Sequence, residues 1–424
     1  MSARMGKFCM ASVFVALAAS DAHAQVIAIK GASVYTEPGK ERADTTVIIR
    51  DGRIRAVGAQ VAIPAGATVI DGQGKIVTAG FVAASSRLGL TEVSLETSTR
   101  EGVLTGGDSR DTDDVVYTAF RVADGYHATS VAIPVARAQG VTTAVAVPAG
   151  GLLSGQAASI VLADELTPAV VQSDSVAMYG NLGEYAMGSA QGSRALALLR
   201  IREVLDDARV YSRNKRAYER NQMRDMTVSR LDLEAVQPVL QKRIPLVLRA
   251  NRSSDILAAI QLGKDFGLTV IIEGAVEGWL VARELAAANV AVIVDPSENL
   301  PDSFDRINVR DDNPAVLADA GVPVAIARIG STHNVGEMRQ LAGIAVANGM
   351  RPEQALAAVT TVPARLFGLD RGTVAVGAVA DVVVWSGDPF ELSTRAEHVI
   401  IGGKAQDLKS RQALLFERYR ELPR

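Results

Sequence analysis

The side chains that most often carry hydrolytic or metal chemistry are scarce in this chain. Its 424 residues contain four histidines and one cysteine. His127, His333 and His398 are far apart, so none forms the close His-x-His pair that places two imidazoles on one metal ion. No Gly-x-Ser-x-Gly turn offers a serine nucleophile, and Cys9 lies near the N-terminus. From these residues we assign no catalytic group, and we expect neither a metal nor a cofactor.

The charge balance excludes another class of partner. The chain has 44 Lys and Arg against 47 Asp and Glu, a net charge of 44 − 47 = −3. A nucleic-acid-binding domain of this size would normally carry a clear basic excess. Hydrophobic residues make up 48% of the chain, which is enough for a large core. We therefore expect a folded protein that does not bind nucleic acid.

Residues 1–24 have the pattern of an export signal. Arg4 and Lys7 supply positive charge, residues 8–19 are apolar, and Ala22-His23-Ala24 fits a small-residue cleavage site. The apolar run is too short to span a bilayer, and no later stretch is long enough. The sequence thus predicts a periplasmic protein, cleaved after Ala24, with no membrane-spanning segment.

Both ends of the remaining chain are rich in short strands and turns. Apolar β-branched runs occupy 26–29, 46–50 and 382–385, and Asp51-Gly52 is a typical hairpin turn. The same pattern of short strands and turns near the two ends of the chain predicts one small domain to which both ends contribute. We expect a composite β-sandwich from residues 25–78 and 367–405, followed by a C-terminal helix in 406–424.

The middle of the chain alternates buried strands with helices. Residues 143–147 and 269–272 are apolar runs of strand length, and 255–266 and 313–320 have helical periodicity. This alternation predicts an α/β fold with a parallel sheet, specifically a (β/α)₈ TIM-like barrel over residues 79–366. Two glycine-containing segments, 153–156 and 178–180, are interpreted as loops.

Three segments carry a resemblance to a known family. Residues 51–58, 69–82 and 377–385 resemble the frame of the metal-dependent amidohydrolase superfamily, nearest to its exported imidazolonepropionase-like and dipeptidase-like branch. The resemblance implies a TIM-like barrel with divalent metal at its C-terminal mouth. There the metal would activate a water molecule and polarise a scissile carbonyl.

The resemblance also locates the positions of the family's metal ligands. In the family these are a His-x-His pair after strand one, single histidines after strands five and six, and an aspartate after strand eight. The matching positions here are Ser85, Arg87, Arg249, Glu273 and Ile329. A guanidinium does not ligate metals and repels a cation. The bridging Lys or Glu of the family has no counterpart that we can place. The metal-ligand motif is therefore predicted to be lost.

These substitutions lead to a functional hypothesis with two alternatives. We expect an amidohydrolase-fold protein without metal-dependent activity of its own. It would act as a homo- or hetero-oligomeric partner or binding module of an amidohydrolase paralogue. One alternative is an active hydrolase of amide or peptide C–N bonds with a different constellation. The other is a solute-binding module that uses the barrel mouth.

The arginines at the former ligand positions suggest what replaces the metal. Arg87, Arg249 and Arg328 would surround Glu273, which should lie within about 4 Å of Arg87 or Arg249. The excess positive charge, together with His333 on the next loop, would hold a small anionic ligand. In the alternative arrangement the arginines point outward and His333 is an ordinary exposed loop residue.

Overall fold

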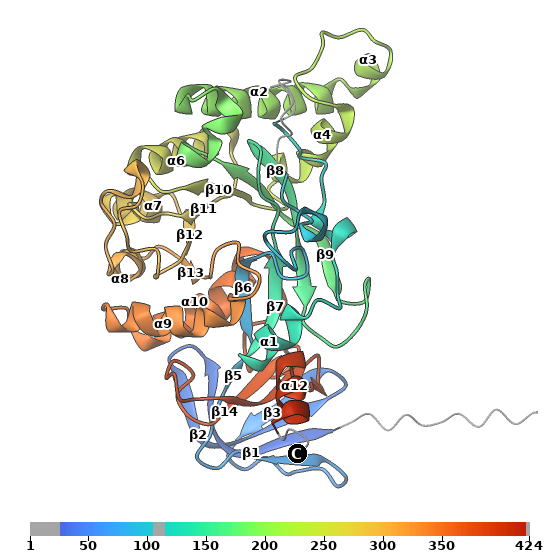
Figure 1. Ribbon diagram of the computed structural model, residues 1–424, viewed down its shortest axis with the longest axis vertical. Coiled ribbons are helices and arrows are strands. Elements are labelled where there is room, and N and C mark those ends of the chain that lie inside the picture. The colour runs from blue at the N-terminus through green and yellow to red at the C-terminus, as the bar shows by residue number, and fades with distance from the viewer. Residues whose placement is uncertain (1–25, 105–114, 421–424) are drawn as a thin grey trace, which may run out of the picture.

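The computed structural model describes residues 26–104 and 115–420, and the predicted export signal in 1–24 lies outside them. An eight-stranded sheet forms the centre, in the order β13-β12-β11-β10-β9-β8-β7-β6 (Figure 1). Its strands are β6 (Phe81–Ser86), β7 (Val141–Ala146), β8 (Leu153–Val161), β9 (Val171–Asn181), β10 (Leu246–Ala250), β11 (Val270–Gly274), β12 (Ala291–Val294) and β13 (Val324–Ile326). A parallel bridge between Ser86 and Ser331 joins the two edges. The sheet nearly closes, so the predicted TIM-like barrel is confirmed.

One strand departs from the all-parallel pattern. β8 runs antiparallel to both β7 and β9, whereas the other neighbours in this sheet are parallel. The prediction of loops at 153–156 and 178–180 was wrong, because these residues lie in β8 and β9. Serine, glycine and glutamine weaken a strand signal in the sequence. Here β8 is buried along its whole length between two partners, and tertiary pairing overrides that local preference.

Helices cover the outside of the barrel (Figure 1). They are α1 (Ala132–Ala138), α2 (Arg194–Arg213), α3 (Lys215–Glu219), α4 (Arg230–Ala235), α5 (Gln237–Leu240), α6 (Ser253–Phe266), α7 (Ala282–Ala287), α8 (Asn313–Asp319), α9 (Met338–Ala347), α10 (Pro352–Val359) and α11 (Thr361–Leu366). Local sequence sets several boundaries. Ser193 caps α2 by accepting a hydrogen bond from the Leu196 amide at 3.2 Å, and Pro352 occupies the first turn of α10.

The barrel interior is a separate core of small and branched side chains. It comprises Ala84, Val145, Val147, Ala157, Val176, Ala177, Tyr179, Val247, Ile271, Ala291, Ile293, Ala325, Ala327 and Phe367. Alanine dominates because eight strands leave little room inside. Phe367 packs in this core, whereas the sequence had assigned it to the β domain. Val374 is already part of the β-domain core, so the boundary lies between these two residues.

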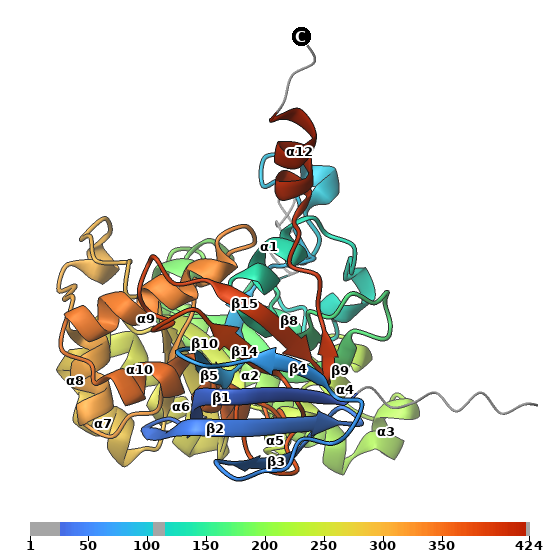
Figure 2. The same ribbon diagram turned by 90° about the horizontal axis from the view of Figure 1, so that it is seen from below.

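The second region is a β domain built from both chain ends (Figure 2). Its strands are β1 (Ile27–Glu37), β2 (Lys40–Arg50), β3 (Arg53–Gly58), β4 (Thr68–Asp71), β5 (Ile76–Ala79), β14 (Val382–Trp385), β15 (Ala396–Ile401) and β16 (Lys404–Ala405). The two ends meet where β5 pairs with β14 antiparallel. Helix α12 (Arg411–Tyr419) lies in the predicted C-terminal helical segment.

The junction between the two regions fixes their orientation. β5 leads through Gly80 directly into β6, so the N-terminal ends of the parallel barrel strands face the β domain. The fully buried Trp385 packs on Phe81 with ring centroids 5.2 Å apart and donates to Thr78 Oγ1 at 2.9 Å. The C-terminal mouth of the barrel therefore opens on the side away from the β domain. None of the helices in the described ranges is long and apolar enough to cross a membrane.

Candidate functional site at the barrel mouth

The first strand brings a serine and an arginine to the mouth. Ser85 is 1% exposed at the end of β6, and its Oγ accepts a hydrogen bond from the Gly330 amide at 3.3 Å. Arg87 follows the strand with a half-buried side chain, and within the described ranges no carboxylate lies within 4.0 Å of it. Burial and then the positive charge of Arg249 lower the pKa of Arg87, and Glu273 offsets this only in part.

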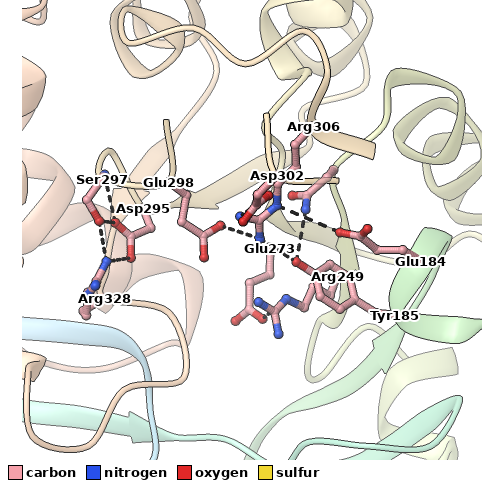
Figure 3. A network of polar contacts seen from close by, with 11 residues as sticks. Glu184, Tyr185, Arg249, Glu273, Asp295, Ser297, Glu298, Asp302, Arg306 and Arg328 are labelled. Atoms are coloured by element: carbon pink, nitrogen blue, oxygen red, sulfur yellow. Dashed lines mark hydrogen bonds and ion pairs between the residues drawn. The ribbon is translucent and has the colours of Figure 1, made fainter. Parts of the chain in front are cut away.

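The fifth and sixth strands of the barrel, β10 and β11, contribute an ion pair to the mouth. Arg249 Nε on β10 lies 3.9 Å from Glu273 Oε2 on β11, a separation of ion pairing without a hydrogen bond. The two residues are register partners, which brings their side chains to the same side of the sheet. The Arg249 guanidinium also stacks over Tyr185, with its carbon 3.9 Å from the ring centroid. Figure 3 shows this group.

Four buried polar atoms around the Arg249–Glu273 ion pair have no hydrogen-bond partner among the described residues. They are Arg87 Nε, Arg249 Nε, Glu273 Oε1 and Asn251 Oδ1. Two are donors and two are acceptors, and all four are shielded from bulk solvent. Buried polar atoms are usually paired, so unpaired ones indicate that a small molecule or water completes the site. Gly274, next to Glu273, has φ +97°, and a Cβ there would lie 2.4 Å from Asn251 Oδ1, so any other residue at this position would displace Asn251.

A second group extends the mouth on the loop after β12. Arg306 pairs with Glu298 at 3.0 Å and donates to the Tyr185 hydroxyl at 2.8 Å (Figure 3). Burial lowers the pKa of Arg306, but the hydrogen bond to Tyr185 and the Glu298 charge outweigh it, so the pKa is raised. Burial raises the pKa of Glu298, against the opposing charges of Arg306 and Arg249.

Within the described ranges, the other residues predicted for this site form no ion pair with Arg249 or Glu273. Arg328 does not join Glu273: it pairs with Asp295 at 3.0 Å and with Glu337 at 3.5 Å. Ile329 packs against the apolar barrel interior. His333 is exposed on the loop after β13, as the alternative expectation described.

The sequence thus located the Arg249–Glu273 pair and the nearby Arg87, and it missed the loop residues Tyr185, Glu298 and Arg306. One available signal was position. Glu298 lies four residues beyond the end of buried strand β12, and active-site groups of barrels gather at the C-terminal ends of strands. Glu298, Arg306, Arg328 and Ile329 all line a cleft of about 540 Å³ at this end.

The donor set at the mouth does not fit a divalent metal. Ser85, Arg87, Arg249, Glu273 and Ile329 offer one carboxylate, two guanidiniums, a weak hydroxyl donor and an aliphatic chain. Structural and catalytic zinc sites use three or four nitrogen, sulfur or carboxylate ligands. Within the described ranges no three His, Cys, Asp or Glu side chains are grouped so that they could hold a metal ion.

Comparison with known proteins agrees with the barrel and its β domain. The sequence model of the Amidohydrolase family matches residues 249–405. The crystal structure of an amidohydrolase from Thermotoga maritima MSB8 superimposes with a TM-score of 0.79 at 26% identity, over 89% of this chain and 99% of that one. The C-terminal part of the chain thus matches the Amidohydrolase family, and the fold as a whole is similar to that of an amidohydrolase.

The chain spans only a part of the curated relatives that it matches. "Amidohydrolase tasK" of Hapsidospora irregularis is 26% identical over 360 residues, covering 73% of this chain. An N-acyl-D-glutamate deacylase of Alcaligenes xylosoxydans xylosoxydans is 47% identical over 64 residues, 12% of this chain. The alignments span 35% and 13% of those two relatives. Molinate hydrolase, at 18% identity and a TM-score of 0.57 over 91% of this chain and 95% of its own, shares the fold.

Proposed function

We propose that this protein is an exported binding module with the amidohydrolase fold that performs no metal-dependent hydrolysis by itself. The observation that carries the proposal is the set of side chains at the family's ligand positions, where Arg87 and Arg249 stand and Glu273 is the one carboxylate. A divalent cation about 5 Å from one guanidinium is repelled by about 7 kcal/mol at an effective dielectric of 20. Glu273 offsets only one of the two guanidiniums at these positions, and the other carboxylates of the mouth, Glu298 and Asp295, pair with Arg306 and Arg328.

The unpaired atoms of the mouth indicate what the module binds. Arg87 Nε and Arg249 Nε can donate to a carboxylate, while Glu273 Oε1 and Asn251 Oδ1 can accept from an N–H group. A small anion with a neighbouring N–H or ammonium group would satisfy all four. The mouth would then hold its ligand through charge-assisted hydrogen bonds in place of metal coordination.

An exposed apolar surface beside the mouth supports a protein partner. Leu300, Phe304 and Ile307 are 68%, 89% and 57% exposed on the segment between β12 and α8, and Leu300 lines the mouth cleft. Clustered exposed apolar residues are typical of interaction sites. The proposed partner is a second amidohydrolase-superfamily chain, either another copy or an active paralogue, that covers this surface.

Metal analysis and kinetics test the proposal directly. The purified protein, expressed with added zinc or manganese and then dialysed, should retain less than about 0.1 metal ion per chain, since a built site holds about one. It should not hydrolyse dipeptides or N-acyl amino acids above background. One metal per chain, or turnover abolished by EDTA, would overturn the proposal. Ser85→His combined with Arg87→His should restore neither, because Arg249 and Ile329 remain.

The partner is tested at the apolar surface. Sedimentation velocity should show self-association or a complex with the paralogue, and Phe304→Ser should weaken it about tenfold or more, the cost of losing a buried aromatic anchor. Leu392→Ser is the matched control, because Leu392 is 73% exposed on the β domain. Equal effects of both substitutions, or an isolated monomer with no complex, would remove the partner role.

A second candidate is hydrolysis without metal, favoured by the raised pKa of Glu298 beside Arg306 and Tyr185. A carboxyl whose pKa is raised by burial holds its proton longer and is a candidate general acid or base. Turnover that is insensitive to EDTA and lost in Glu298→Gln would establish this function and replace the binding-module proposal.

A further inference from the structure

The opposite end of the barrel contains a second cavity, about 630 Å³ in volume, between the N-terminal strand ends and the β domain. Five basic residues line it: Arg53, Lys242, Arg243, Arg365 and Arg371. Asp370 is the single acidic residue in its wall. The surrounding charge is therefore strongly positive, although the chain as a whole has a net charge of −3.

Only part of this positive charge is compensated. Arg53 lies 3.5 Å from Asp370, and Arg371 pairs with the buried Asp381. Arg243 and Arg365 are exposed, and no carboxylate of the residues that the structure describes lies within 4.0 Å of either one. At least these two guanidiniums are free to meet an anion.

The floor of the cavity adds an independent observation. Thr143 Oγ1, Ser159 Oγ and Ser175 Oγ line it, are shielded from bulk solvent, and have no hydrogen-bond partner among the described residues. Thr143 lies two residues from Val145, and Ser159 two from Ala157, both of which belong to the barrel interior. Side chains alternate along a strand, so both hydroxyl-bearing residues face inward, in the lowest layer of the barrel.

The reversed strand explains why three hydroxyls meet there. β7 and β9 begin at the end facing the β domain, whereas the antiparallel β8 ends there. Residues early in β7 and β9 are thus adjacent to residues late in β8, and Ser159 is register partner of Ser173. The inward-facing side chains are apolar further inside the barrel, and those at the end facing the β domain carry hydroxyl groups.

From this arrangement we propose that the cavity binds a phosphate monoester. A phosphate group carries about −1.5 to −2 charges and several strong acceptor oxygens, which match free guanidiniums on the rim and hydroxyls on the floor. Rotation about χ1 turns a serine or threonine hydroxyl between staggered positions, so these donors can reorient toward an occupant. The organic part of the ester would contact the apolar wall formed by Val176, Phe367 and Leu369. This site is separate from the barrel mouth and does not depend on the function proposed there.

Calorimetric titration of the whole protein tests the ligand class. Phenyl phosphate, inorganic phosphate and benzoate serve as probes at matched ionic strength. Phenyl phosphate should bind saturably and about tenfold or more tightly than benzoate, which has one charge and two acceptor oxygens. Inorganic phosphate should fall between them. Benzoate binding as tightly as phenyl phosphate, or no saturable binding of either phosphate, would overturn the proposal.

Paired variants locate the site. Arg243→Gln with Arg365→Gln should weaken phenyl phosphate binding about tenfold or more, because each charge-assisted hydrogen bond lost has an effect of that order. The control is Arg283→Gln with Arg395→Gln, which makes the same charge change at exposed positions that do not line the cavity. The control should change the affinity by less than about twofold. Equal loss in both pairs would show only non-specific attraction and would contradict the site.

Discussion

The two ends of the barrel manage positive charge in different ways. At the mouth, Arg249, Arg306 and Arg328 each lie within 4.0 Å of a carboxylate, whereas Arg87 has no carboxylate of the described residues within that distance. At the end facing the β domain, Arg243 and Arg365 are exposed and unpaired in the same sense, above a floor of buried hydroxyls.

This difference in charge compensation shows how the two ends of one barrel can suit different ligands. The mouth compensates its cations with carboxylates from neighbouring strands and loops, so little net attraction remains for a multiply charged anion. The opposite end leaves its cations free in a cavity with orphan donors. A ligand of modest charge therefore suits the mouth, and a ligand of higher charge suits the other end.

The largest expected effect is at the Arg371–Asp381 pair beside the second cavity. Asp381 is 2% exposed, accepts from the Gly402 amide at 2.7 Å and pairs with Arg371. Asp381→Ala should lower the free energy of unfolding by about 3–5 kcal/mol, because it leaves a buried cation and an amide unpaired. Urea unfolding measures this. Asp381→Asn keeps the acceptor for the Gly402 amide and removes only the charge, so it should lose less. Equal losses would show that the ion pair with Arg371 alone carries the effect and the hydrogen bond adds nothing.

The corresponding pair at the mouth should matter less. Arg249 and Glu273 are 3.9 Å apart without a hydrogen bond, and the Arg249 side chain is 24% exposed. We expect Glu273→Ala to lower the free energy of unfolding by about 2–3 kcal/mol, below the full range for buried pairs. Glu165→Ala, at an exposed pair with Lys404, is the control and should cost less than about 1 kcal/mol. A loss at Glu273 no greater than at Glu165 would mean that the mouth pair is not structurally important.

A pair of glycines compares the crowding at the two ends. Gly274 at the mouth has φ +97° and a Cβ would lie 2.4 Å from Asn251, whereas Gly368 beside the second cavity has φ +65° and open space around it. Gly368→Ala should cost about 1 kcal/mol from backbone strain alone. Gly274→Ala should cost about 2–3 kcal/mol, since Asn251 must also move. Thermal unfolding of both variants checks the order, and the reverse order would contradict the packing at the mouth.

The smallest effect concerns pH. Because the pKa of Glu298 is raised, the folded protein binds this proton more tightly than the unfolded chain does. The stabilisation that this proton gives the folded protein is complete below the pKa of the unfolded chain, about 4.3. It is lost as the pH rises through the higher pKa of the folded state. Glu298→Gln lacks this titration, so the variant should become more stable relative to the wild type as pH rises through that window. Melting temperatures measured from pH 4 to 7 test the sign, and the opposite trend would show that the pairing with Arg306 dominates.

The sequence by itself determined the elements whose patterns are strong. Apolar runs and turns predicted a barrel with a β domain made from both chain ends, and the scarcity of histidine limited the metal chemistry open to the mouth. These features depend on local sequence or on composition, so they can be predicted without knowledge of the tertiary contacts. The proximity of Arg249 and Glu273 followed from the family resemblance, which placed both at ligand positions of one site, and the two residues are register partners on adjacent parallel strands.

Only the tertiary structure decided the features that depend on partners distant in sequence. Strand β8 has a weak local signal and exists because it is buried between β7 and β9. Arg328 was expected near Glu273, but it forms an ion pair with Asp295 instead. The second cavity joins Arg53 of the β domain to Arg371 and the strand ends of the barrel, positions more than 300 residues apart at the extremes. Side-chain contacts over such separations depend on how strands register and domains dock, which neither composition nor periodicity specifies.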